Sequence, residues 1–144
     1  PITGLVSHGP GWLHLGNPGL AHYGIHALEL AYAVLGPGCQ QVYCVSSDQG
    51  DSLEAQWADG RQLTLRTLRI GATGYGLLSF HPQGIVHTPI STRFSYRNLC
   101  QQIVHAFTTG RPPVPLEEAV EIQRFIAAAI TSAACGQPAT LNYS

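Results

Sequence analysis

Two histidines and a glutamate stand at helical spacing near the start of the chain. His22 and His26 are four residues apart, and Glu29 follows three residues after His26. On one continuous helix the three side chains would share a face, because each residue turns the helix by about 100°. Two imidazoles and a carboxylate on one face can bind a substrate, transfer a proton or hold a metal ion.

Further imidazole and aromatic side chains surround this pair in the sequence. Trp12 and Tyr23 can stack on a ligand ring or simply pack within the fold, and His14 lies in a Gly/Pro-rich loop over 9–18. A zinc site is an alternative, on His22 and His26 with further ligands from nearby residues, although no HExxH motif is present. Those further ligands would be His8, His14 and Glu29.

Length and composition narrow the class of protein. The chain has 144 residues and a formal net charge of -1, which predicts one domain with a buried core and gives no basic surface for nucleic acid. No apolar run reaches the length of a membrane-spanning helix. Methionine and lysine are both absent, so Pro1 is expected to be a trimmed or internal start, and this chain alone cannot complete a lysine-dependent mechanism.

The four cysteines show no CxxC spacing. This pattern favours free thiols in a reducing compartment over a zinc or redox motif. We therefore expect a cytoplasmic protein.

The order of predicted elements indicates an α+β fold. A strand over 2–8 precedes a helix over 18–35, and two helices over 96–109 and 116–135 close the chain. Between them, Asp59-Gly60 is typical of a hairpin turn. We expect one domain over 1–144, with an open, mainly antiparallel sheet and helices packed on one face. The remaining predicted strands cover 41–47, 52–58, 61–70, 75–80, 85–89 and, at the sheet edge, 138–142.

Apolar periodicity predicts how these elements pack. The helices over 96–109 and 116–135 are each expected to pack an apolar stripe against one face of the sheet. Leu63 and Leu65 suggest that the opposite, open face of the sheet is not wholly polar. A homo-oligomer through that open face is predicted. Arg61, Arg66 and Arg69 are expected in solvent or at an interface. The two stripes are Leu99, Ile103 and Phe107, then Ala119, Ile122, Ile126, Ile130 and Ala133.

Two segments carry a resemblance to a known family. Gly24, His26 and Glu29 match a Gly-x-x-x-Asp-x-Gly-x-His-x-x-Asp pattern, with His22 in the place of its first aspartate. The segments 113–122 and 128–138 match a last helix with a Ser-x-x-x-Gly-x-Pro exit. In both respects the chain resembles the C-terminal domain of the Gfo/Idh/MocA oxidoreductases, the group of glucose-fructose oxidoreductase and inositol dehydrogenase.

The resemblance implies a substrate-binding domain of an NAD(P)-dependent enzyme that acts on a sugar-like or cyclitol-like polyol. His26 would face the nicotinamide ring and the substrate hydroxyl as the catalytic proton acceptor. The residues implied to bind substrate are His22, Trp12, His14, Tyr23 and Glu29.

The family's N-terminal Rossmann domain and its catalytic lysine have no counterpart in this sequence. No strand–GxGxxG–helix unit is present, since the glycines over 71–76 precede a predicted strand. We therefore expect the chain alone to bind neither NAD nor NADP, and to be inactive as a dehydrogenase by itself.

Two other hypotheses remain open at this point. The chain is alternatively a stand-alone isomerase or lyase, with or without a metal, that uses the His22/His26 pocket. It is alternatively a non-catalytic domain that associates with partners through its sheet.

Overall fold

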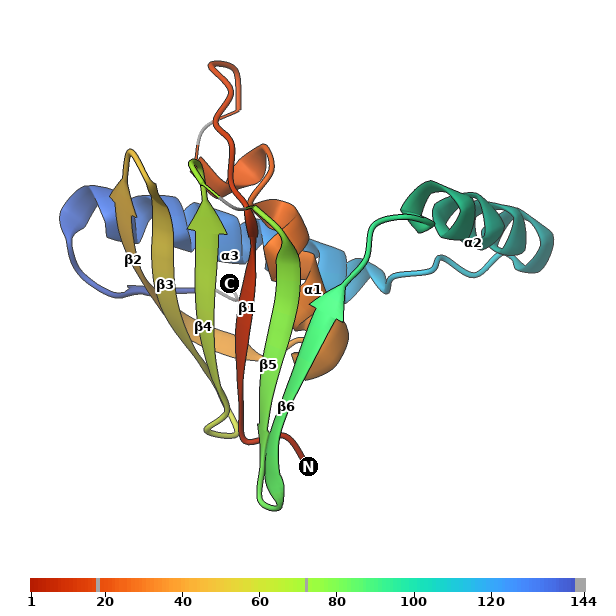
Figure 1. Ribbon diagram of the computed structural model, residues 1–144, viewed down its shortest axis with the longest axis horizontal. Helices are drawn as coiled ribbons and strands as arrows, with labels where there is room; N and C mark the ends of the chain where they lie inside the picture. The colour runs from red at the N-terminus through yellow and green to blue at the C-terminus, as the bar shows by residue number, and fades with distance from the viewer. Residues whose placement is uncertain (18, 72, 142–144) are drawn as a thin grey trace.

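The computed structural model describes residues 1–17, 19–71 and 73–141. In this part of the chain, seven strands form one sheet in the order β6-β5-β1-β4-β3-β2-β7 (Figure 1). β1 pairs in parallel with β4, and every other described strand pair is antiparallel. The strands are β1 (Gly4–Pro10), β2 (Cys39–Ser47), β3 (Gly50–Trp57), β4 (Gln62–Leu68), β5 (Tyr75–His81), β6 (Gly84–Ile90) and β7 (Ala139–Thr140).

Two helices, α1 (Ile25–Leu35) and α3 (Leu116–Cys135), cover one face of the sheet, behind it in Figure 1. The predicted α+β fold, with an open and mainly antiparallel sheet, is confirmed. The predicted edge strand is present as β7, although Asn142 lies outside the described residues. Among the described residues, no helix has both the length and the apolar character needed to cross a membrane.

The side chains of β4 alternate between the helices and the open sheet face. Leu63 and Leu65 are 0% exposed, and they face the helices because positions two apart in a strand share a face. The predicted placement of these leucines on the open face is therefore wrong. That face instead carries a mixture of side chains, among them Tyr43, Val45, Glu54, Thr64 and Arg66.

The third helix, α2 (Ser95–Thr109), does not pack on the sheet. None of its described side chains is buried, and it projects away from the sheet and the other helices (Figure 1). The predicted packing of Leu99, Ile103 and Phe107 against the sheet is therefore wrong. The helices that pack on the sheet are α1 and α3.

α3 buries a different stripe from the predicted one. Ile122 and Ile126 are buried as expected, whereas Ala119, Ile130 and Ala133 are exposed. The polar side chains of Glu121 and Ser132 are buried instead. Backbone N–H groups donate hydrogen bonds to both side chains, and such partners offset the cost of burying a polar group.

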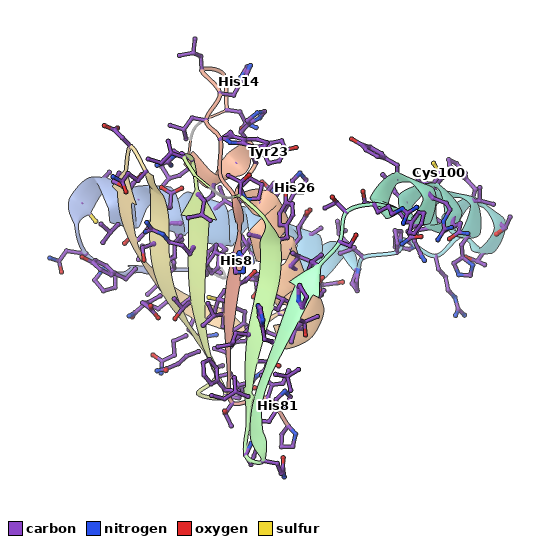
Figure 2. The ribbon with its side chains drawn as sticks, viewed as in Figure 1. His8, His14, Tyr23, His26, His81 and Cys100 are labelled. Atoms are coloured by element: carbon purple, nitrogen blue, oxygen red, sulfur yellow. The ribbon has the colours of Figure 1, made fainter. Side chains whose placement is uncertain are left out.

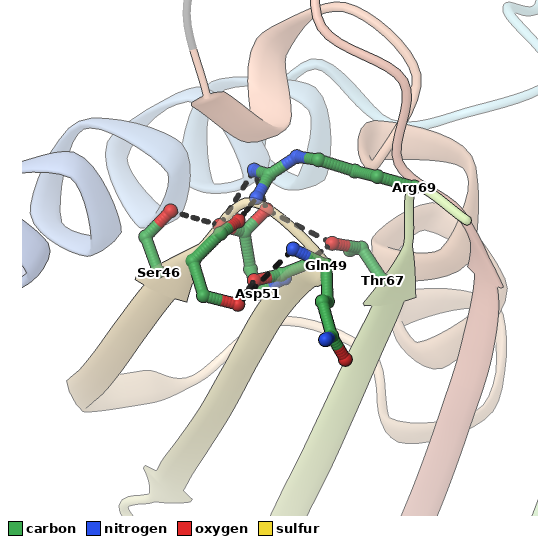
Figure 3. A network of polar contacts seen from close by, with 7 residues as sticks. Ser46, Gln49, Asp51, Thr67 and Arg69 are labelled. Carbon is green, nitrogen blue, oxygen red and sulfur yellow. Dashed lines mark hydrogen bonds and ion pairs between the residues drawn. The ribbon is translucent and has the colours of Figure 1, made fainter.

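A buried ion pair joins the ends of β3 and β4 (Figure 3). Nη2 of Arg69 lies 2.8 Å from both carboxylate oxygens of Asp51, which also accepts hydrogen bonds from Ser46 Oγ at 2.6 Å and Thr67 Oγ1 at 2.9 Å. Arg69 also donates to the carbonyl of Ser47. Arg69 is therefore a buried structural cation and not the surface arginine that the sequence predicted.

Candidate active-site cleft

The single helix predicted over 18–35 is interrupted. A short 3₁₀ helix, η1 (Gly19–Ala21), and a turn precede α1, and Pro18 lies outside the described residues. His22 therefore stands before α1, whereas His26 and Glu29 lie within it. The predicted shared helical face of His22 and His26 is wrong.

Gly24 sits at the interruption, where the chain turns tightly onto the core. A Cβ atom on Gly24 would lie 2.7 Å from Cδ2 of Leu20 and 3.1 Å from Cγ2 of Thr67. A side chain at position 24 would therefore force Leu20 or Thr67 to shift. Thr67 is itself held by hydrogen bonds to Asp51, which restrain its movement away from Gly24.

A cleft of about 770 Å³ opens beside the start of α1. Its walls come from the end of β1 and the loop after it, α1, the segment before β5, the end of β6 and the start of α2. Four of the predicted site residues line it: Trp12, Tyr23, His26 and Glu29. A second depression, of about 510 Å³, lies on the outer surface of α3 and contains none of these groups.

His26 and Glu29 form a hydrogen-bonded pair in the cleft wall. Nδ1 of His26 lies 3.0 Å from Oε2 of Glu29, and the two side chains are 52% and 51% exposed. In the neutral tautomer that donates from Nδ1 to the carboxylate, Nε2 keeps its lone pair and accepts a proton. The half-exposed ring is open to a ligand and is not sealed in the core.

Aromatic rings extend the wall on either side of this pair. The rings of Trp12 and Tyr23 have centroids 4.6 Å apart, and Tyr23 meets His26 edge-on at 5.3 Å. Figure 2 shows Tyr23 and His26 together near the start of α1. This surface offers both flat apolar faces and hydrogen-bonding groups, as small-molecule sites commonly do.

Tyr75 completes the cleft and was not predicted. Burial raises the pKa of Tyr75, and the nearby Tyr23 and Glu29 raise it further, so its hydroxyl stays a hydrogen-bond donor. Its ring lies against Gly9, where a Cβ atom would come within 2.5 Å of the ring. The sequence signal was an aromatic residue between two glycines, Gly74 and Gly76, at the start of a strand.

His14 and His22 lie together outside the residues that line the cleft. Their ring centroids are 5.1 Å apart, and His14 occupies the loop at the tip of the molecule, away from His26 (Figure 2). His22 also contacts the ring of Tyr23 at 5.7 Å. The structure thus separates the five predicted substrate-binding residues into three that line the cleft and two that do not.

The predicted metal ligands are brought together only in pairs, His14 with His22 and His26 with Glu29. His8 lies on β1, where its Nδ1 is 2.9 Å from the carbonyl oxygen of Gly74. Among the described residues, no group of three histidine, cysteine, aspartate or glutamate side chains is placed to hold a metal ion. The geometry therefore gives no support to the zinc alternative.

No protein-family model and no curated protein matches the chain. Solved structures do match. GenD2 from gentamicin A biosynthesis, in complex with NAD, has a TM-score of 0.75 at 19% identity, over 96% of this chain and 54% of that chain. A myo-inositol dehydrogenase from Corynebacterium glutamicum has a TM-score of 0.77 at 15% identity, over 98% and 56%.

The myo-inositol 2-dehydrogenase from Lactobacillus plantarum is similar to a comparable extent, with a TM-score of 0.75 at 15% identity over 98% of this chain and 57% of that chain. These structures are oxidoreductases of the Gfo/Idh/MocA type. At such low identity the likeness is one of fold. The chain therefore shares the fold of one region of these oxidoreductase chains, and that region makes up a little more than half of each of them.

Proposed function

We propose that the chain is the substrate-binding part of an NAD(P)-dependent oxidoreductase that acts on a sugar-like or cyclitol-like polyol. The His26–Glu29 pair in an aromatic-walled cleft carries this proposal. It is supported by the shared fold with dehydrogenase chains, of which two are named for inositol. A polyol presents C–H faces to the rings of Trp12 and Tyr23 and hydroxyl groups to the polar side chains.

Each side chain of the pair has a distinct role in this proposal. Nε2 of His26 accepts the proton of the substrate hydroxyl while the hydride leaves the carbon that bears this hydroxyl. Glu29 is a positioning residue, because its carboxylate holds Nδ1 of His26 and so selects the tautomer that accepts at Nε2. Bound nicotinamide supplies the hydride acceptor.

The size of the cleft supports a small polyol as its occupant. Its volume of about 770 Å³ falls within the usual size of small-molecule sites. The sequence has no glycine-rich phosphate-binding turn between a strand and a helix. We therefore assign the pyrophosphate of the cofactor to a separate dinucleotide-binding domain, and with it the dehydrogenase activity of the assembled enzyme.

The test of this function is spectrophotometric. The complete protein, in which this chain acts with a dinucleotide-binding domain, should reduce NAD or NADP when it is supplied with a panel of cyclitols and sugars. Absence of reduction with every member of the panel and both cofactors would overturn the proposal.

This chain alone should bind neither NADH nor NADPH with submillimolar affinity, because nothing in its sequence provides the dinucleotide fingerprint. The measurement is a calorimetric or fluorescence titration of the chain over residues 1–144. A known nicotinamide-dependent dehydrogenase under the same buffer conditions is the positive control. Submillimolar binding of either cofactor would contradict the assignment of the pyrophosphate to another domain.

We also propose a cytoplasmic homo-oligomer that forms through the open sheet face. Tyr43 and Val45 expose apolar surface there beside Glu54 and Thr64, a composition similar to that of protein interfaces. Light scattering should show at least a dimer, and Val45→Glu should shift it toward monomer. A monomer at high concentration would contradict this part of the proposal.

A further inference from the structure

α2 carries an apolar stripe that the rest of the described chain leaves uncovered. At about 100° per residue, five side chains fall within about 100° of the helix circumference. Four of them are large and well exposed: Tyr96 at 83%, Leu99 at 52%, Ile103 at 44% and Phe107 at 88%. With the exposed Cys100, they form what we call the α2 stripe. The opposite side of the helix is polar, with Asn98, Gln101, Gln102 and His105.

The α2 stripe is continuous with the candidate active-site cleft. Tyr96 and Leu99, at its first turns, line the same cleft as His26. Cys100 and the rest of the helix stand away from the sheet (Figure 2). A body that packs on the α2 stripe therefore also forms a wall of the cleft.

We propose that the α2 stripe is the docking surface of the dinucleotide-binding domain, an inference that rests on the function proposed above. Hydride transfer requires the nicotinamide and the substrate carbon to come within about 3–3.5 Å of each other. The domain that carries the cofactor must therefore reach the cleft beside His26. Among the described residues, the α2 stripe is an extended apolar surface that borders this cleft and is not covered by another element.

Two observations agree with a dinucleotide-binding domain as the occupant: the length of the matched chains and the charge around α2. The matched dehydrogenase chains hold a further body of nearly domain size, since this chain covers only 54% and 56% of two of them. The α2 region is cationic, with Arg93, Arg97 and Arg111 and no acidic residue over 61–116. The docking rim of the partner should therefore be neutral or acidic. A second copy of this chain on the stripe would border the cleft without bringing a cofactor.

Thiol labelling of the complete protein tests the proposal, because Cys100 lies within the α2 stripe. Cys135, at the end of α3, is also exposed and is the internal control. Cys39 and Cys44 are buried, and burial raises their pKa values to about 12 and about 11, which keeps them unreactive. The labelling rate of each cysteine is read by peptide mapping after pulses of iodoacetamide.

If the domain is docked on the α2 stripe, Cys100 should react with iodoacetamide at least tenfold more slowly than Cys135. In denaturant the two cysteines should react at similar rates. Phe107→Glu should abolish that protection and raise the KM for the cofactor, whereas Gln102→Glu, on the polar side of α2, should leave both unchanged. Circular dichroism confirms that each variant is folded. Protection that disappears on dilution, with cofactor reduction retained, would instead assign the α2 stripe to a second copy of the chain.

The two proposals fail in different ways. If the complete protein reduces NAD or NADP with a polyol but Cys100 reacts as fast as Cys135, the docking proposal alone is overturned. If it reduces neither cofactor, or if no dinucleotide-binding domain is encoded with it, the proposed function is overturned and the docking proposal with it.

Discussion

His26→Ala should lower the turnover of the complete oxidoreductase by roughly 10²–10⁴-fold, the usual contribution of a positioned acid–base group. The substrate hydroxyl loses its proton acceptor when the imidazole is removed. The affinity for the cofactor should stay nearly unchanged, because the proposed function places the dinucleotide on another domain. Steady-state kcat and KM for the polyol, together with the Kd for NADH, measure these effects.

Two matched variants sharpen this test. Glu29→Gln keeps the size of the side chain but weakens the acceptor for Nδ1 of His26, so turnover should fall by less than in His26→Ala. His81 is the control, since it lies at the far end of β5 beside Ser79 (Figure 2), and His81→Ala should retain the activity. An equal loss in His26→Ala and His81→Ala would rule out a catalytic role for His26.

Glu121→Ala should lower the free energy of unfolding by about 3 kcal/mol or more, the cost expected when buried donors lose their acceptor. The carboxyl group accepts hydrogen bonds from the N–H of Gly38 at 2.7 Å, the N–H of Cys39 at 2.9 Å and the hydroxyl of Tyr32 at 3.0 Å. It therefore fastens α3 to the end of α1 and the start of β2.

Denaturant unfolding, followed by tryptophan fluorescence, measures this loss. Trp57 is buried next to Tyr32 and reports on this region, with the two ring centroids 5.6 Å apart. Glu117→Ala is the matched control, because Glu117 is exposed in the first turn of the same helix and should contribute less than about 1 kcal/mol. A similar loss in both variants would show that the buried hydrogen bonds of Glu121 are not the cause.

The sequence predicted the bounds of the helices and strands better than it predicted which elements pack against each other. The bounds of α3 follow from local chemistry: Pro115 precedes the helix, and Gly136 ends it in the left-handed region. The β3–β4 hairpin was likewise predicted from Asp59-Gly60. The apolar stripes of α2 and α3 are alike in sequence, however, and periodicity does not specify which body covers a stripe. That is why α2 was wrongly placed on the sheet.

The candidate site was predicted only in its local part. His26, Tyr23 and Glu29 lie within one short segment, in which His26 and Glu29 match the family pattern, so the sequence alone named them as candidates. Tyr75 and Tyr96 reach the same cleft from segments far along the chain, and no local pattern connects them to His26. Arg69 was misplaced for the same reason, since its partner Asp51 is brought to it by the β3–β4 pairing.

The position of β1 has a consequence for the order in which the protein folds. Leu5 precedes both of its sheet neighbours, Leu63 on β4 and Ser79 on β5, by a long stretch of chain. β1 therefore has no partner strand until β4 and β5 have been synthesised. Until then its apolar side chains need protection from premature contacts, because the centre of the sheet depends on pairing between strands far apart in the sequence.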